Sequence, residues 1–273
     1  MAHPATAEKL NTHLALAPGD APLSEFKDRI RLLSFNIQTG IATRRYHEYV
    51  TRGWRQLVHD SGRPANLARI GSLLRAYDLV GLQEVDAGSF RSGYLNQVEY
   101  LADQAELAYW YSQRNRRLGR LAQHGNGLLS RATPDALEDA RLPSRIPGRG
   151  AIVARYDLGA GDPLLVVSVH LSLGIRDRYR QLAWLAERFG NRPRVVLMGD
   201  MNTSRKGLLE HSPLAGSGFR SALSVPTPTF PSWRPRQELD HVLVSPDLQV
   251  HQAEVLTQRF SDHLPIGVEL SWS

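Results

Sequence analysis

The segment Val195-Val196-Leu197-Met198-Gly199-Asp200-Met201-Asn202 decides the fold class of this 273-residue chain. Its apolar half has the length of a buried strand, and the glycine then permits a tight turn into polar residues. Because side chains alternate along extended backbone, Asp200 and Asn202 face the same side. That arrangement suits a base and an orienting donor that act on one water molecule. The segment therefore predicts a buried strand of an α/β protein with reactive groups at its end.

Short apolar runs and segments of helical period alternate along the rest of the chain, which is typical of α/β proteins. The predicted strands are Ile30 to Ile37, Leu79 to Gln83, Asn126 to Ser130, Gly150 to Tyr156, Leu164 to His170, Arg194 to Met198, His241 to Ser245 and Gly267 to Leu270. The predicted helices are Pro64 to Tyr77, Gln97 to Glu106 and Ile175 to Phe189. No proline-rich or serine-rich linker follows residue 30, so we expect one domain over residues 28–273 behind a flexible tail, residues 1–27.

The composition restricts the chemistry that the chain can use. It contains no cysteine, which excludes disulfides, thiolate zinc sites and a cysteine nucleophile. The formal net charge is +6, and arginine supplies nearly all of the positive side chains. Arginine suits bidentate contact with phosphate, so a polyanionic partner is one reading and a generally basic composition is the other. A cytoplasmic location is expected, because no signal-peptide pattern and no apolar stretch of about 18 residues is present.

The segment from Ile41 to Arg63 stands apart because arginines alternate with aromatic residues such as Tyr46 and Trp54. Such a surface can hold phosphates and stack on nucleic-acid bases, or lie on anionic lipid headgroups. The same pattern also fits an amphipathic helix whose aromatic side chains pack on the core. All three readings remain open at this point.

Carboxylates, amides and histidines recur at the ends of the predicted strands. Hydrolysis of a phosphodiester needs a cation, an activated water and fixed donors, and Mg²⁺ or Mn²⁺ prefers carboxylate and amide oxygens. Any single cluster also fits a turn or a salt bridge, whereas the repeated pattern does not. The clusters in order are Phe35-Asn36-Ile37, Leu82-Gln83-Glu84, Gly125-Asn126-Gly127-Leu128-Leu129-Ser130, Ser168-Val169-His170-Leu171, Gly199-Asp200-Met201-Asn202, Leu239-Asp240-His241 and Ser261-Asp262-His263.

This ordered set resembles the endonuclease/exonuclease/phosphatase superfamily over nearly the whole chain, from about Ile30 to the C-terminus. The superfamily includes pancreatic-type deoxyribonuclease, neutral sphingomyelinases and inositol polyphosphate phosphatases, and the chain is also similar to small bacterial members encoded beside cardiolipin synthase. The resemblance implies an α/β (α+β) four-layer sandwich, in which two packed mixed β-sheets are flanked by helices. It further implies a monomeric phosphodiesterase that needs Mg²⁺ or Mn²⁺ and hydrolyses its substrate by metal-assisted attack of water.

The resemblance also assigns roles to individual residues. Glu84 matches the principal metal ligand of the superfamily, and Asn36 and Asp262 match further ligands, bound directly or through water. Asp200 matches the residue that orients or deprotonates the attacking water. Asn202 matches the amide that holds this water or a phosphate oxygen.

Three further positions complete the catalytic set that the resemblance implies. His263 matches the histidine that contacts the scissile phosphate, Asp240 matches the acid that fixes its ring, and His170 lies at a position near the leaving group. His241 receives no role, because strand alternation points it away from Asp240. The candidate substrate-binding residues are Asn126, Arg149, Arg176, Gln38 and Trp233.

The substrate is less defined than the chemistry. The positive charge and the segment from Ile41 to Arg63 favour a nucleic acid, and therefore an endonuclease-like enzyme. A phospholipid or sphingomyelin headgroup is the alternative, with the same segment as a membrane-surface element and no transmembrane segment. A catalytically silent binding module is a third reading, but it predicts lost ligands, and Glu84, Asp200, Asp262 and His263 are all present.

Overall fold

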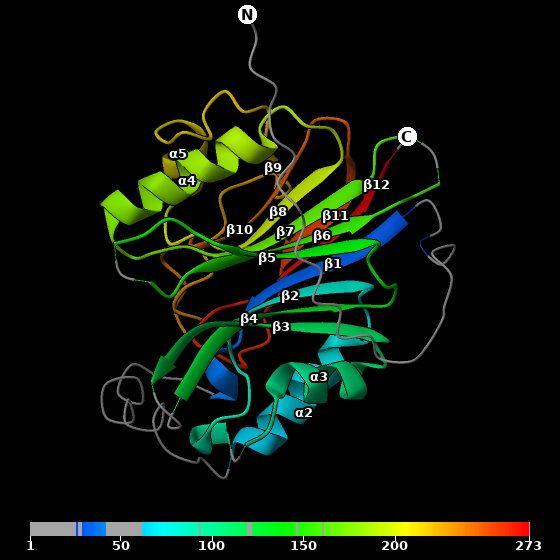
Figure 1. Ribbon diagram of the computed structural model, residues 1–273, viewed down its shortest axis with the longest axis vertical. Coiled ribbons are helices and arrows are strands. Elements are labelled where there is room, and N and C mark those ends of the chain that lie inside the picture. The colour runs from blue at the N-terminus through cyan, green and yellow to red at the C-terminus, as the bar shows by residue number, and fades with distance from the viewer. Residues whose placement is uncertain are drawn as a thin grey trace, which may run out of the picture.

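The structure is a computed structural model that describes residue 26 and residues 29–41, 62–92, 94–118, 122–145, 147–159 and 161–272. The predicted tail of residues 1–27, apart from Phe26, and most of the segment from Ile41 to Arg63 lie outside the described residues. Two six-stranded sheets pack against each other and carry helices on their outer faces (Figure 1). None of the described helices is long and apolar enough to cross a membrane.

The first sheet has the strand order β11-β12-β1-β2-β4-β3, and α2 and α3 cover its outer face (Figure 1). Its central strands β1 and β2 are parallel, while the other neighbours are antiparallel. The bounds are β1 (Arg29–Asn36), α2 (Arg63–Leu74), β2 (Leu79–Asp86), α3 (Gln97–Ala105), β3 (Tyr109–Leu118), β4 (Ala122–Ser130), β11 (Gln249–Val255) and β12 (Ile266–Ser271). Two short 3-10 helices, η2 (Gln38–Gly40) and η4 (Phe90–Ser92), follow β1 and β2.

The second sheet has the strand order β5-β6-β7-β8-β10-β9, and α4 lies across its outer face (Figure 1). It too has one parallel pair, β7 and β8. The bounds are β5 (Ala136–Arg141), β6 (Gly150–Tyr156), β7 (Leu164–His170), α4 (Ile175–Phe189), β8 (Val195–Asp200), α5 (Arg205–Leu209), β9 (Arg220–Ser221) and β10 (Asp240–Val244). The predicted sandwich of two mixed sheets flanked by helices is confirmed.

Three apolar layers hold these elements together. Leu32, Ile152 and Met198 belong to the layer between the two sheets, where both sheets bury their inner faces. A second layer joins the helix stripe that includes Leu185 to the outer face of the second sheet, and a third joins α2 and α3, through residues such as Leu67, to the first sheet. Burial of apolar surface in all three layers stabilises the fold and fixes the sheets relative to each other.

The two parallel strand pairs determine where reactive side chains meet. In the first sheet Asn36 pairs with Gln83 at the carboxyl ends of β1 and β2, and in the second His170 pairs with Asp200 at the ends of β7 and β8. Parallel strands deliver their carboxyl ends to one edge of a sheet, which is where α/β proteins build their sites. Gly199 is required here, because a Cβ atom at this position would overlap the carbonyl oxygen of Val169.

All eight predicted strands and all three predicted helices are present, with ends displaced by a few residues. The largest extensions are at β2, which continues to Asp86, and β4, which begins at Ala122. Strands β3, β5, β9 and β11 and the short helix α5 were not predicted. These four strands are the outermost strands of the two sheets.

Candidate active site

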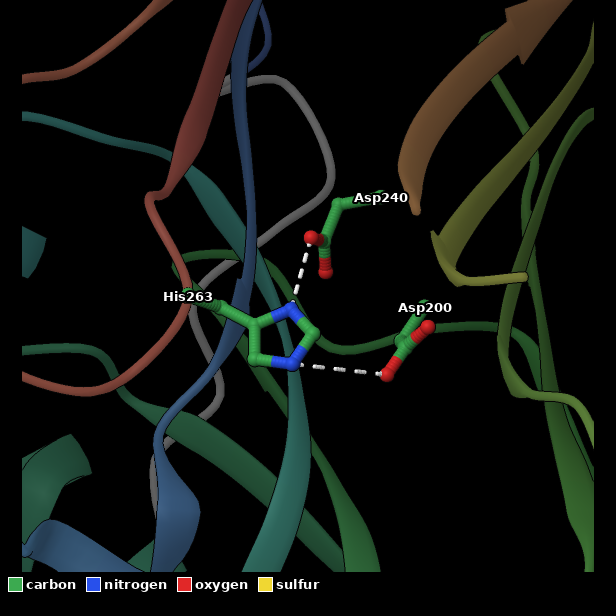
Figure 2. Close-up of side chains that lie close together, drawn as sticks. All are labelled: Asp200, Asp240 and His263. Carbon is green, nitrogen blue, oxygen red and sulfur yellow. Dashed lines mark hydrogen bonds and ion pairs between the residues drawn. The ribbon is translucent and has the colours of Figure 1, made fainter. Parts of the chain in front are cut away.

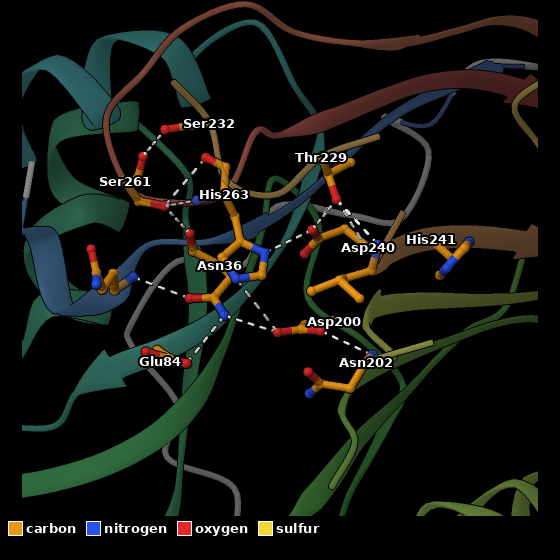
Figure 3. A network of polar contacts seen from close by, with 12 residues as sticks. Asn36, Glu84, Asp200, Asn202, Thr229, Ser232, Asp240, His241, Ser261 and His263 are labelled. Carbon is orange, nitrogen blue, oxygen red and sulfur yellow. Dashed lines mark hydrogen bonds and ion pairs between the residues drawn. The ribbon is translucent and has the colours of Figure 1, made fainter. Parts of the chain in front are cut away.

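The candidate site centres on Asn36, which links carboxylates from the two sheets (Figure 3). Its Nδ2 donates to Oδ2 of Asp200 at 3.1 Å and to Oε1 of Glu84 at 3.3 Å. Its Oδ1 accepts a hydrogen bond from the backbone N–H of Gln38 at 3.1 Å, which fixes the amide plane. The side chain that ends β1 therefore holds the end of β2 and the end of β8 in one cluster.

Glu84 enters this cluster because β2 bulges at its position. The register between β2 and β4 shifts between Gln83 and Val85, and Glu84 adopts a φ of 56°. A bulge re-aims a side chain, and a positive φ at a non-glycine residue is typical of functional sites. Asp86, two residues further on, instead accepts hydrogen bonds from Ser89 and Ser92 and organises the following loop. Of the two acids in β2, Glu84 is thus the one that reaches the site.

The loop before β12 supplies Asp262 and His263. Ser261 anchors it, because its hydroxyl donates to the backbone oxygen of Asn36 at 2.6 Å and accepts from the N–H of His263 at 2.9 Å. The backbone of Asp262 accepts a hydrogen bond from the N–H of Ser232 at 2.7 Å. The Asp262 carboxyl is buried, and its Oδ1 has no hydrogen-bond partner among the described residues. An acceptor in that state has capacity for a cation.

His263 lies between Asp240 and Asp200 (Figure 2). Its Nδ1 is 2.8 Å from Oδ2 of Asp240, and its Nε2 is 3.9 Å from Oδ2 of Asp200. His170 approaches the same Asp200 oxygen, with its Nε2 at 3.4 Å. The hydroxyl of Thr229 donates to Asp240 at 2.6 Å and so fixes the acid that orients the His263 ring. One carboxylate of the second sheet is therefore flanked by two imidazoles.

The backbone also positions Asp200. The N–H of Asn202 donates to its Oδ1 at 3.0 Å, and Asn202 itself adopts a φ of 52°. The side-chain Nδ2 of Asn202 donates to the backbone oxygen of Leu171 at 2.9 Å, which joins the turn after β8 to the loop after β7. His241 points away from the site, where its Nε2 lies 2.7 Å from the backbone oxygen of Thr203. The prediction from strand alternation for His241 is confirmed.

Burial and mutual repulsion make the acids of this cluster weak. Burial, with the charges of Asp240 and Glu84, raises the pKa of Asp200 to about 7, although His263 and Asn36 oppose this shift. Burial, with Glu84 and Asp200, likewise raises the pKa of Asp262 to about 7 against the effect of His263. Burial alone would lower the pKa of His263, but the carboxylates of Asp240, Asp200 and Asp262 raise it well above its ordinary value. The site therefore favours an added positive charge.

Two sets of side chains could hold a cation. Ligand atoms of Asp200, Asp240 and His263 lie within 4.8 Å of one another. In that set, however, Nδ1 of His263 is already bound to Asp240. The raised pKa of His263 also favours its protonated form, and an imidazolium repels a metal ion. The carboxylates of Glu84 and Asp262 repel each other's charge, and Oδ1 of Asp262, like Oδ1 of Asp240, lacks a partner within the described residues, but no imidazolium is bound to either Glu84 or Asp262. Glu84, Asp262 and the adjoining Asn36 fit a hard divalent cation better.

The candidate substrate residues differ in position. Asn126 is buried, and its Nδ2 donates to Gln113 at 3.0 Å and to the backbone oxygen of Gly150 at 3.1 Å. It therefore connects the first sheet to β6 of the second sheet rather than lining an open surface. Arg176 is exposed in the first turn of α4.

The remaining three candidates lie in loops. Gln38 is buried in η2 directly after Asn36. Arg149 is half-buried just before β6, and its backbone oxygen accepts a hydrogen bond from the N–H of Leu142 at 3.1 Å. Trp233 is half-buried in the loop before β10, and the neighbouring Ser232 ties that loop to Asp262.

Two supporting residues of the site were not assigned from the sequence. Thr229 binds Asp240, and the ring of Phe230 packs on the His263 ring with centroids 4.9 Å apart. The Thr-Phe pair ahead of Asp240 was a usable signal, since a loop that immediately precedes a site strand lies against that strand's first residues. Phe230 therefore packs against the His263 ring directly, and Thr229 fixes the ring through Asp240.

Comparisons with known proteins identify the family of this chain. The model of the Endonuclease/Exonuclease/phosphatase family matches residues 33–263. The chain belongs to this family. Its members are hydrolases that act on phosphoesters and generally use a divalent metal. A UPF0294 protein of Klebsiella pneumoniae (strain 342) is 26% identical over 266 residues, which cover 93% of this chain and 86% of that protein.

Solved structures of family members share the fold. An endonuclease/exonuclease/phosphatase from Beutenbergia cavernae has a TM-score of 0.68 at 21% identity, covering 90% of this chain and 72% of that chain. A mannosyl-6-phosphatase from Bacteroides thetaiotaomicron has a TM-score of 0.64 at 17% identity, covering 89% of this chain and 100% of that chain. The family member described here is therefore a phosphoester hydrolase of the deoxyribonuclease-I-like fold.

Proposed function

We propose that the protein is a divalent-metal-dependent phosphodiesterase that cleaves a phosphodiester of nucleic acid by attack of water. The observation that carries this proposal is the position of Asp200, a buried carboxylate between His170 and His263 that Asn36 links to Glu84. A base, two imidazoles and a cation-binding acid within one cluster supply the groups that phosphodiester hydrolysis needs.

Asp200 is the candidate base. Its pKa of about 7 matches proton transfer near neutral pH, where a general base is most effective. The hydrogen bonds from Asn36 and from the N–H of Asn202 fix both carboxyl oxygens, so the acid orients a water molecule as well as accepting its proton. We assign Asp200 this role, with Asn202 as the residue that holds the turn in place.

The two histidines serve the phosphate. Asp240 favours the imidazolium form of His263, which then donates from Nε2 to a nonbridging phosphate oxygen. His170, on the neighbouring strand end, protonates the leaving oxygen. A developing negative charge is thus met by donors that are already in position, which lowers the barrier.

Glu84, Asp262 and Asn36 are assigned to the metal. A bound Mg²⁺ or Mn²⁺ supplies charge neutralisation at the phosphoryl oxygens and polarises the phosphorus centre. Glu84 contributes a half-buried carboxylate, Asp262 a buried carboxylate with an unfilled acceptor, and Asn36 the amide that fixes Glu84. At this position a divalent charge would offset the mutual repulsion that raises the pKa values of Asp200 and Asp262.

Nucleic acid is the favoured substrate because the chain has a net charge of +6 and nearly all of its positive side chains are arginines, which bind phosphate bidentately. One observation favours the alternative, a phospholipid or sphingomyelin-type headgroup. Leu173, Ile175 and Tyr179 are 74%, 76% and 56% exposed around the first turn of α4, next to the arginines of the same helix. Apolar side chains beside basic ones are typical of surfaces that lie on anionic membranes.

A substrate panel tests the proposal. Plasmid DNA, abasic duplex, RNA, sphingomyelin vesicles, phosphoinositides and bis-p-nitrophenyl phosphate are each incubated with the protein and Mg²⁺ or Mn²⁺, and again with EDTA. The proposal predicts EDTA-sensitive cleavage of the chromogenic diester and of a nucleic acid. Lipid hydrolysis without nucleic-acid cleavage would support the alternative, and hydrolysis that EDTA leaves unchanged would contradict both.

A further inference from the structure

Three arginines lie in the first two turns of α4, and one of them, Arg178, contacts the loop that follows His170. Arg176 is exposed, and Arg180, whose side chain is 57% exposed, pairs with Asp177 at 3.5 Å on the outer surface. Arg178 is half-buried, and its Nη1 donates to the backbone oxygens of Ser172 at 3.1 Å and Leu173 at 2.8 Å. Its side chain therefore folds back over the loop that connects His170 to α4.

This loop is tied directly to the candidate catalytic residues. The N–H of Leu171 donates to the backbone oxygen of Asp200 at 2.9 Å, and Asn202 donates to the backbone oxygen of Leu171 at 2.9 Å. Gln181 fixes the next residue, since it accepts from the N–H of Ser172 and donates to its hydroxyl, both at 2.9 Å. The loop that holds Arg178 is therefore hydrogen-bonded to the backbone of Asp200 and to the side chain of Asn202.

The charge of Asp200 reaches the guanidinium. Burial lowers the pKa of Arg178, and Asp200 opposes that shift, so the two groups interact electrostatically. An arginine that is partly desolvated and faces an acid is prepared to bind an oxyanion.

One edge of the guanidinium is used by the protein and the other is not. The two hydrogens of Nη1 go to the two loop carbonyls, while Nε and Nη2 have no hydrogen-bond partner in the described part of the chain. The Nε and Nη2 hydrogens form a planar fork that matches two oxygens of a phosphate. The fork is held by a rigid loop, so little entropy is lost when it binds.

We infer that Arg178 is a substrate-binding residue of this enzyme, whose Nε–Nη2 fork grips the scissile phosphate from the His170 side of the site. The inference rests on the proposed function and replaces Arg176 by Arg178 as the arginine of α4 that contacts substrate. Arg180, two residues further along α4, has its side chain on the outer surface and serves as the matched control, while Arg176 is the candidate that Arg178 replaces.

The test compares Arg178→Gln and Arg178→Lys with Arg176→Gln and Arg180→Gln, using hydrolysis of bis-p-nitrophenyl phosphate with Mn²⁺. We expect kcat/KM to fall about 30-fold or more in Arg178→Gln, because a charge-assisted bidentate contact is lost. Arg178→Lys restores little of this activity, since one ammonium group cannot hold the loop carbonyls and a phosphate together. The control substitution Arg180→Gln changes kcat/KM by less than about twofold, and Arg176→Gln loses much less activity than Arg178→Gln.

Binding of inorganic phosphate to the Mn²⁺-loaded proteins separates substrate contact from support of the loop. We expect calorimetry to give a phosphate Kd about tenfold larger in Arg178→Gln than in the parent, with an unchanged Kd in the control Arg180→Gln. Methylguanidinium should restore part of the activity of Arg178→Ala. Equal kcat/KM and equal phosphate affinity in Arg178→Gln and Arg176→Gln would overturn the inference while leaving the phosphodiesterase proposal intact. An inactive parent that still shows the Arg178-dependent phosphate binding would overturn the proposed function alone.

Discussion

The two sheets contribute different chemistry to the candidate site. The first sheet and its loops supply Glu84 and Asp262, of which Asp262 keeps a buried oxygen without a partner among the described residues. The second sheet supplies Asp200, whose two carboxyl oxygens accept hydrogen bonds from Asn36 and Asn202. It also supplies Asp240, whose Oδ2 is bound by Thr229 and His263, while its Oδ1, like that of Asp262, has no partner among the described residues. Glu84 and Asp262 suit a cation, whereas Asp200, fixed by donors at both oxygens, and Asp240, which holds the His263 ring, suit the handling of protons. We therefore assign metal binding to the first sheet and proton transfer to the second.

The largest effect is expected on the proton-transfer side. Asp200→Asn keeps the shape of the side chain and removes the base, so kcat should fall by about 1000-fold at saturating Mn²⁺. Steady-state hydrolysis of bis-p-nitrophenyl phosphate measures this change, and thermal unfolding serves as the control for folding. A variant that keeps more than about a tenth of the parent kcat would remove Asp200 from the role of base.

A smaller effect is expected from the pair His263 and Asp240. Either His263→Gln or Asp240→Asn should reduce kcat about 100-fold, because each removes the oriented imidazolium. The kcat of the double variant should lie within about twofold of the kcat of His263→Gln, because Asp240 acts through the His263 ring. Losses that multiply in the double variant would show that Asp240 contributes to catalysis independently of His263.

The crowding of acids from both sheets predicts a dependence of stability on pH. The folded-state pKa values of Asp200 and Asp262 are near 7 against an ordinary value of 3.8, so between pH 4 and 7 the folded protein holds protons that the unfolded chain has released. Stability of the metal-free protein therefore falls as pH rises through this window. The raised pKa of His263 acts in the same direction above its ordinary value of 6.5.

Calorimetric or fluorescence-monitored unfolding in EDTA at pH 5.5 and pH 8 measures this dependence. We expect the Tm to be lower at pH 8 by roughly 5 °C from these groups, and saturating Mn²⁺ to raise the Tm more at pH 8 than at pH 5.5. A metal-free protein that is more stable at pH 8 than at pH 5.5 would contradict the raised pKa values of Asp200 and Asp262.

The smallest effect is expected at His241, one residue from Asp240 on the same strand. His241→Phe removes the contact with the backbone oxygen of Thr203, so the free energy of unfolding should fall by about 1–3 kcal/mol. The kcat should change by less than about twofold, because the side chain points away from the cluster. A loss of kcat comparable to that of Asp240→Asn would mean that the two faces of β10 are not separate.

The interior of the fold was predictable from the sequence, and its edges were not. The eight interior strands bury both faces or end on the site, so apolar runs such as Val195–Asp200 reveal them. The four outer strands carry polar and charged residues, as in Ala136–Arg141 and Gln249–Val255, where Ala140 is the only buried residue of the two strands. Edge strands with such composition give little apolar periodicity, because neighbouring strands and not local sequence hold them.

The candidate site divides in a similar way. Residues named by strand-end motifs, such as Glu84, Asp200 and His263, lie in one cluster in the structure. The bulge that aims Glu84 and the folding back of Arg178 could not be predicted, since both depend on contacts with other elements. Arg176 was named from the sequence and Arg178 was not, because only the contacts of Arg178 with the loop after His170 distinguish the two. Local pattern identified the reactive groups, while tertiary contacts decided their orientation.

The most direct test of the division between the sheets is the affinity of Mn²⁺ for the parent, Glu84→Gln and Asp200→Asn, measured by isothermal titration calorimetry. The account predicts that Glu84→Gln raises the Kd by at least about tenfold, whereas Asp200→Asn changes it by less than about threefold. The opposite result, with Asp200→Asn losing the metal and Glu84→Gln retaining it, would place the cation among Asp200, Asp240 and His263 and contradict the account.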